Sequence, residues 1–184
     1  MPGKGLKDSQ IILGVTGSIA AYKAVALARE LTVAGAVVTA VMTPNATRFV
    51  TPLSFQTVTR RKVITDLWTP VDTFDAEHVA LARKADLVCV APATANILGK
   101  AAAGIGDEAL SCLLMTVKCP VIYAPAMNSG MFLCPAVQRN IKTLVDWGCQ
   151  FVGPSEGRLA DGTTGIGRLA DIDEIMAVIR RNLE

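Results

Sequence analysis

The sequence has few charged residues, few aromatic side chains and a single histidine. Only 18% of its 184 residues are charged and 5% are aromatic, and the formal net charge is +2. No long run of Lys or Arg is present, so the charge pattern gives no reason to expect binding to nucleic acid or to a membrane surface. Because His78 has no second histidine to join it, a histidine-rich metal site is excluded and no metal is expected.

The cysteines and the apolar runs favour a cytoplasmic location. The five cysteines have no C-x-x-C spacing and mostly lie in apolar runs, so we expect reduced, buried thiols. No apolar run is long enough for a transmembrane helix, and the N-terminal residues lead into a strand rather than a signal sequence. No membrane partner is therefore expected.

Apolar residues are abundant, at 51% of the chain. A chain of this length can bury one core but is too short for two ordinary domains, so residues 1–184 are expected to form a single domain. The low charge content is unusual for a soluble monomer, and burial of further surface in a homo-oligomer would explain it.

Strand-like apolar runs alternate with helix-like segments along the chain. This alternation predicts an α/β fold, a doubly wound and mostly parallel sheet of the Rossmann or flavodoxin-like kind, with ligands beyond the carboxyl ends of the strands. We expect strands over 11–15, 37–42, 86–92, 120–125 and 149–152, the last of them the final strand, and helices over 20–34, 78–85, 94–103, 107–116, 135–147 and 171–182.

Three segments are less regular. Residues 44–58 suit short helical pieces, and residues 62–68 suit either a strand or an extended arm. The third segment, residues 153–167, holds five glycines and a proline. We interpret 153–168 as a functional flap, the alternative being a disordered surface loop.

One of the expected helices, over 107–116, would carry acidic residues in its first turn.

The first strand runs through Gly14-x-x-Gly17-Ser18 into a helix. Free backbone N–H groups at the positive end of a helix dipole, with the Ser18 hydroxyl, suit a phosphate. The third glycine of the dinucleotide fingerprint and the P-loop lysine are both missing, and the second strand ends in Thr43 instead of a ribose-binding acid. A mononucleotide such as FMN is therefore favoured over NAD, unless the glycines serve only close packing.

Four polar residues fall where predicted strands end. They are Ser18, Thr43, Thr94 and Asn128. Because the carboxyl ends of parallel strands share one edge of a sheet, we expect these side chains to lie near one ligand.

Four pieces of sequence in order carry a family resemblance. They are Gly17-Ser18-Ile19-Ala20-Ala21-Tyr22-Lys23, the single His78, Pro92-Ala93-Thr94-Ala95-Asn96, and Pro125-Ala126-Met127-Asn128-Ser129-Gly130-Met131-Phe132. Together they resemble the homo-oligomeric flavin-containing cysteine decarboxylases, most closely the phosphopantothenoylcysteine decarboxylases of coenzyme A biosynthesis. Phe132 replaces the last Trp of that family's motif. Asp161, in Ala160-Asp161-Gly162, replaces a cysteine of the family's flap.

The resemblance implies bound FMN and a homo-trimer or trimer-based dodecamer whose sites are shared between subunits. It implies a small-molecule or peptide substrate with a cysteine carboxylate. The residues implied for FMN are Gly17, Ser18, Ile19, Thr43, Ser54, Thr94, Ala95, Asn96, Ala126 and Met127, and those for the substrate are Lys23, Asn128, Ala160 and Asp161.

Three residues are expected to take part in the chemistry. His78 would be the base, since its ordinary pKa is near neutrality, although a lone histidine is often structural. Asn128 would bind a substrate carboxylate or amide, or else only cap a helix. Asp161 would make a poor proton donor, which leaves the second half of the family reaction open. The alternatives are a peptidyl-cysteine decarboxylase that releases an enethiol and a flavin-binding protein without turnover.

Overall fold

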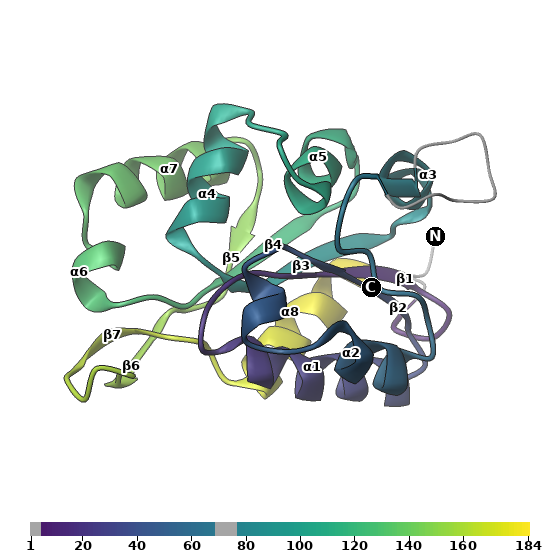
Figure 1. Ribbon diagram of the computed structural model, residues 1–184, viewed down its shortest axis with the longest axis horizontal. Coiled ribbons are helices and arrows are strands. Elements are labelled where there is room, and N and C mark those ends of the chain that lie inside the picture. The colour runs from purple at the N-terminus through teal and green to yellow at the C-terminus, as the bar shows by residue number, and fades with distance from the viewer. Residues whose placement is uncertain (1–4, 69–76) are drawn as a thin grey trace.

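The computed structural model describes residues 5–68 and 77–184 and contains the predicted parallel sheet. Five strands pair in the order β2-β1-β3-β4-β5, all parallel. This confirms the doubly wound α/β class (Figure 1). The strand bounds are β1 Gln10–Val15, β2 Val37–Met42, β3 Leu87–Ala93, β4 Val121–Pro125 and β5 Gln150–Phe151.

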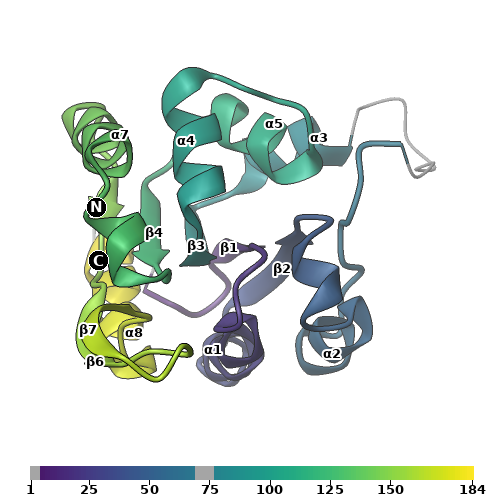
Figure 2. The same cartoon turned by 60° about the vertical axis from the view of Figure 1, so that its left-hand side comes forward.

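Helices cover both faces of the sheet (Figures 1 and 2). One face packs against α1 (Ala21–Val33), α2 (Pro52–Thr59) and α8 (Ile172–Leu183). The other face packs against α3 (Glu77–Lys84), α4 (Ala95–Ala103), α5 (Ala109–Thr116) and α7 (Pro135–Asp146). Every residue of β3 is buried, as its unbroken apolar sequence predicts for a strand covered on both faces.

Gly14 lies inside β1 and serves packing. A Cβ there would stand 2.8 Å from Cδ1 of Leu110, so the absence of a side chain lets α5 approach the sheet. Of the two glycines in the predicted phosphate motif, only Gly17 lies in the turn itself.

One expectation about a helix end needs correction. No acidic residue lies in the first turn of α5, because the helix begins at Ala109 and Glu108 is its N-cap. Glu108 and Ser111 form a reciprocal capping box, which satisfies backbone N–H groups that the helix leaves free. The same device, made by Asp171 and Glu174, begins α8.

The segment after β2 has the short helical pieces expected there, η1 (Ala46–Arg48) and α2. The chain then returns as an extended arm beside β2. Ile64 forms an isolated bridge with Val41, and the Ile64 carbonyl accepts a hydrogen bond from the Met42 N–H at 2.8 Å.

The glycine-rich segment is not a plain loop, and β5 is not the last strand. Ser155–Arg158 forms β6 and Thr164–Arg168 forms β7, and the two pair as an antiparallel hairpin. Sequence periodicity misses this hairpin because glycine at Gly157, Gly165 and Gly167 leaves little apolar alternation. Before it, the short helix α6 (Ser129–Phe132) follows β4.

The five cysteines are all free, but only Cys89 is fully buried. Cys134 is exposed and the other three are half-buried, so the expectation of buried thiols holds for one position alone. In the described residues, no helix has the length and apolar character needed to cross a membrane.

Candidate functional site

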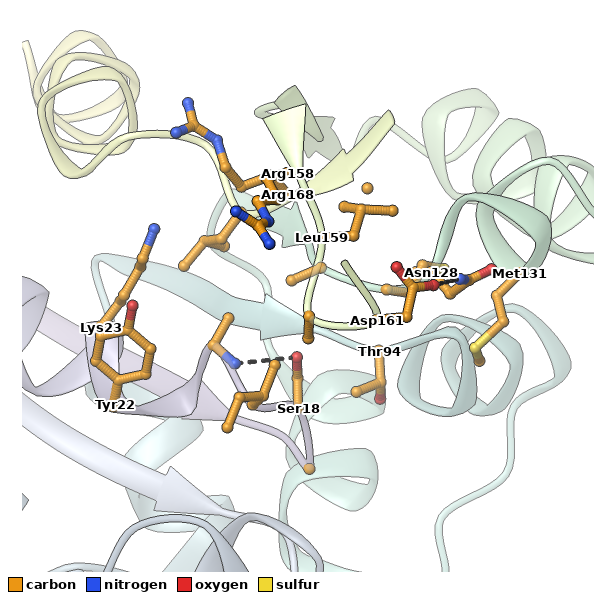
Figure 3. A pocket seen from close by; sticks show the side chains of 18 residues that line it. Ser18, Tyr22, Lys23, Thr94, Asn128, Met131, Arg158, Leu159, Asp161 and Arg168 are labelled. Atoms are coloured by element: carbon orange, nitrogen blue, oxygen red, sulfur yellow. Dashed lines mark hydrogen bonds between the residues drawn. The ribbon is translucent and has the colours of Figure 1, made fainter. Parts of the chain in front are cut away.

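A cavity of about 680 Å³ opens beyond the carboxyl ends of β1, β3 and β4 (Figure 3). The β6–β7 hairpin forms its outer wall. Its volume is in the range of small-molecule and cofactor sites. The lining residues are Gly17, Ser18, Ile19, Ala20, Tyr22, Lys23, Thr94, Ala126, Met127, Asn128, Met131, Arg158, Leu159, Ala160, Asp161, Gly167, Arg168 and Leu169.

The turn between β1 and α1 forms the floor at one side. A Cβ on Gly17 would stand 2.6 Å from Cβ of Asn45, so glycine is required where these two loops meet. The Ser18 Oγ accepts a hydrogen bond from the Ala20 N–H at 3.3 Å. Within the described residues, no hydrogen-bond partner is found for the N–H groups of Gly17 and Ile19. The turn therefore offers a hydroxyl and free backbone donors, the chemistry that binds a phosphate.

A buried hydroxyl that the sequence analysis missed holds two of the strand ends together. Thr16 Oγ1 donates to the Pro92 carbonyl at 2.7 Å and accepts from the Thr94 N–H at 3.1 Å. Thr94 is the N-cap of α4 and accepts from the Ile97 N–H. The sequence carries no local signal for this role, because the hydrogen bonds of Thr16 span 76 and 78 residues of the chain.

Asn128 caps a helix and also contacts the flap, and its role toward a substrate stays a prediction. It is the N-cap of α6, and its Oδ1 accepts from the Gly130 N–H at 2.7 Å. Its Nδ2 donates to Oδ2 of Asp161 at 2.5 Å, so the amide also contacts the flap at the edge of the cavity (Figure 3).

The hairpin docks on the segment that follows β4. The Met127 N–H donates to the Gly167 carbonyl at 3.0 Å, and Ser129 Oγ donates to the Ile166 carbonyl at 2.5 Å. A Cβ on Gly167 would stand 2.1 Å from the Met127 carbonyl oxygen, and a Cβ on Gly165 would stand 2.6 Å from Ser129 Oγ. Glycine at these two positions therefore permits the close approach of the flap.

Asp161 is exposed and accepts hydrogen bonds on both carboxylate oxygens. Oδ1 accepts from Thr163 Oγ1 at 2.6 Å and from the Thr163 N–H at 2.9 Å, and Oδ2 accepts from Asn128. These donors, those of Thr163 first, hold the pKa of the Asp161 carboxyl below its ordinary value, because they stabilise the charged form. Asp161 is therefore ionised at neutral pH.

Most of the residues predicted for the site line the cavity. Those implied for the cofactor that lie there are Gly17, Ser18, Ile19, Thr94, Ala126 and Met127, and all four implied for the substrate, Lys23, Asn128, Ala160 and Asp161, lie there too.

Four residues predicted for the cofactor are not among the lining residues, Thr43, Ser54, Ala95 and Asn96. Thr43 is buried at the end of β2, where its Oγ1 accepts from the Ala46 N–H at 3.2 Å. Ser54 lies in α2 with its hydroxyl 3.4 Å from that of Thr51. Their roles toward a cofactor stay predictions.

His78 lies in α3, and its side chain is outside the described part of the structure. Both views place α3 far from the β6–β7 hairpin, across the sheet (Figures 1 and 2). Its role as the base stays a prediction.

Two cations that were not predicted, Arg158 and Arg168, join Lys23 in the lining. Asn128 and Asp161 lie together at one side of the cavity, and Lys23 lies at the other (Figure 3). The arginines belong to the glycine-rich segment, so an inspection of the charged residues of the flap would have found them.

Comparison with known proteins places this site in context. The flavoprotein family model matches residues 3–184. The coenzyme A biosynthesis bifunctional protein CoaBC of Bacillus subtilis (strain 168) is 45% identical over 177 residues, which are 96% of this chain and 44% of that protein. The chain thus spans less than half the length of the curated relatives that it matches.

Two solved structures superpose closely. A mutant PPC decarboxylase complexed with pantothenoylaminoethenethiol has a TM-score of 0.87 and 30% identity, over 95% of this chain and 98% of that one. The FMN-dependent cysteine decarboxylase SpaF has a TM-score of 0.83 and 32% identity, over 97% of this chain and 99% of that one.

Proposed function

Because this chain belongs to the flavoprotein family, we propose that it binds FMN and catalyses the oxidative decarboxylation of a cysteine carboxylate. The substrate in this proposal is phosphopantothenoylcysteine or a close analogue, and the setting is coenzyme A biosynthesis in the cytoplasm. The observation that carries the proposal is one cavity that joins a phosphate-type turn at Ser18 to the Asn128 amide and the flap.

The residues of the cavity fit FMN. Ser18 and the free N–H groups of Gly17 and Ile19 would bind its phosphate, at the N-terminal end of α1. Apolar side chains, among them Ile19 and Met127, would pack on its ring system. No acid follows β2 to hold a dinucleotide ribose, which supports a mononucleotide.

A cysteine carboxylate needs an electron sink before it can lose carbon dioxide. Bound FMN supplies a two-electron oxidation of the carbon that carries the thiol. The resulting thioaldehyde is beta to the carboxylate, so carbon dioxide leaves and the electron pair of the broken bond remains as an enethiolate. Asn128 would bind the carboxylate of the substrate through its amide, and His78 would remove a proton.

The separation of α3 from the cavity within one chain supports a site shared between subunits (Figures 1 and 2). In a homo-trimer, or a dodecamer built from trimers, α3 of one subunit would approach the cavity of another. Exposed apolar side chains outside the cavity, such as Phe49 and Leu53, are available for such contacts. Native mass spectrometry of the FMN-loaded protein would give the number of subunits.

One observation favours a product that remains an enethiol. Asp161 is ionised, and it replaces the flap cysteine of the resembling decarboxylases, which would donate the proton that completes reduction to the saturated thiol. A peptide that ends in cysteine remains the alternative substrate.

The test has two stages. Denaturation of the purified protein should release FMN, and the FMN-loaded protein should release carbon dioxide from phosphopantothenoylcysteine.

The role of His78 has its own test. The variant His78→Asn should retain FMN, but its rate of carbon dioxide release should fall by roughly 10²–10⁴-fold, the usual contribution of a positioned base. Release of NAD or FAD, or turnover of His78→Asn at the parent rate, would contradict the corresponding assignment.

A further inference from the structure

The Asn128 amide already binds a carboxylate when the flap is docked. Its Oδ1 is held by the Gly130 N–H, which fixes which end of the amide faces the cavity. Of its two N–H donors, one points to Oδ2 of Asp161 at 2.5 Å. The flap thus places a carboxylate on the same group that the proposed function assigns to the carboxylate of the substrate.

Asp161 brings a full negative charge to this position. Three hydrogen bonds, two from Thr163 and one from Asn128, stabilise the ionised form. The three cations that line the cavity, Lys23, Arg158 and Arg168, lie away from Asn128 and Asp161 (Figure 3), so they do not neutralise the pair of groups at Asn128. A second carboxylate bound to Asn128 would lie within a few ångströms of Asp161 and would be repelled.

From this geometry we infer that Asp161 determines specificity: with the flap docked, the site prefers a ligand that lacks a carboxylate, which is the decarboxylated product, over the substrate. The inference rests on the proposed function. Entry of the substrate requires Asp161 to leave Asn128. Loss of neutral carbon dioxide then removes the competing charge, and Asp161 returns to the amide.

The chain offers a nearly isosteric variant. Asp161→Asn removes the charge but keeps an oxygen that can accept from Asn128 and Thr163. Asp161→Ala removes both the charge and the contact with Asn128. Asp146→Asn is the matched control, since Asp146 is an exposed carboxylate on α7 that pairs with Lys142.

The ligands are a matched pair without turnover. N-pantothenoylserine carries the carboxylate and N-pantothenoylethanolamine lacks it, and a hydroxyl in place of the thiol prevents the reaction. Isothermal titration of the FMN-loaded protein gives both Kd values, and a flavin fluorescence titration checks the Kd of FMN.

We expect the parent and Asp146→Asn to bind the ethanolamine ligand about tenfold more tightly than the serine ligand, from the repulsion of two like charges near the surface. In Asp161→Asn and in Asp161→Ala this preference should disappear or reverse while the Kd of FMN stays the same. An unchanged preference in both variants, or a parent that prefers the serine ligand, would overturn the inference. If the protein loads FMN but binds neither ligand, the substrate class of the proposed function is wrong and the inference fails with it.

Discussion

The hydroxyl of Thr16 and the backbone N–H of Thr94 lie 3.1 Å apart, and this hydrogen bond connects the end of β1 to the start of α4. The same hydroxyl donates to the Pro92 carbonyl, so one buried group satisfies two backbone atoms. It holds the Ser18 turn and the Thr94 loop in a fixed relation across the floor of the cavity.

Thr16→Val should destabilise the fold and weaken FMN binding. Valine has nearly the same shape but leaves the Thr94 N–H and the Pro92 carbonyl without this partner, which costs about 2 kcal/mol for buried groups. For a chain of this size we expect the melting temperature to fall by roughly 4–8 °C, measured by calorimetry. Thr16→Ser keeps the hydroxyl and should retain FMN affinity. Equal FMN affinity in the Val and Ser variants would contradict the positioning role.

Gly167→Ala should release the flap. Its φ of +145° is rare for residues with a side chain, and the new Cβ would stand 2.1 Å from a backbone oxygen of Met127. Trypsin cleavage after Arg158 should therefore become roughly tenfold faster, because strain of this kind costs on the order of 1–3 kcal/mol and cleavage follows the open population. Gly99→Ala, where the nearest side-chain atom is 3.5 Å away, is the control. Equal cleavage rates in the two variants would mean that the flap does not depend on Gly167.

Asp161→Cys should change the product. The lowered pKa of Asp161 keeps its carboxyl ionised at neutral pH, whereas a thiol with an ordinary pKa of about 8.5 is mostly protonated and can donate. In anaerobic single turnover, the parent should lose its flavin absorbance and yield a product two hydrogens short of the saturated thiol. The variant should yield some saturated thiol and recover absorbance.

The product of the parent should not change between about pH 6 and pH 8, since protonation of Asp161 requires pH values below its ordinary pKa of about 3.9. A parent that makes the saturated thiol with full recovery of flavin absorbance would show that another group donates the proton. The enethiol would then not be the final product.

The cysteines should react in order of exposure. Burial raises the pKa of the Cys89 thiol to about 12, so almost no thiolate exists there at neutral pH, and the reagent cannot reach it. Cys134 is exposed at the start of α7. Iodoacetamide followed by peptide mass mapping should label Cys134 first and Cys89 only after denaturation. Labelling of Cys89 in the native protein at a comparable rate would contradict the packing of β3.

The sequence alone determined the sheet and one side of the site. Strands covered on both faces must be apolar throughout, so β1, β3 and β4 could be predicted from unbroken apolar runs. Parallel strands end at one edge, and this predicted that Ser18, Thr94 and Asn128 would line one cavity. Thr43 also ends a strand, but its hydroxyl accepts from the Ala46 N–H, and Thr43 is not among the residues that line the cavity.

Only the tertiary structure decided how the flap meets this edge. Asn128 and Asp161 are 33 residues apart, and their contact depends on the docking of β6 and β7 through backbone groups of Met127 and Gly167. Backbone hydrogen bonds between distant segments leave no periodic pattern of side chains, so the sequence carries no local signal for them. The substitution of aspartate at 161 was visible in the sequence, whereas the amide that it occupies became known only when the chain folded the flap onto Asn128.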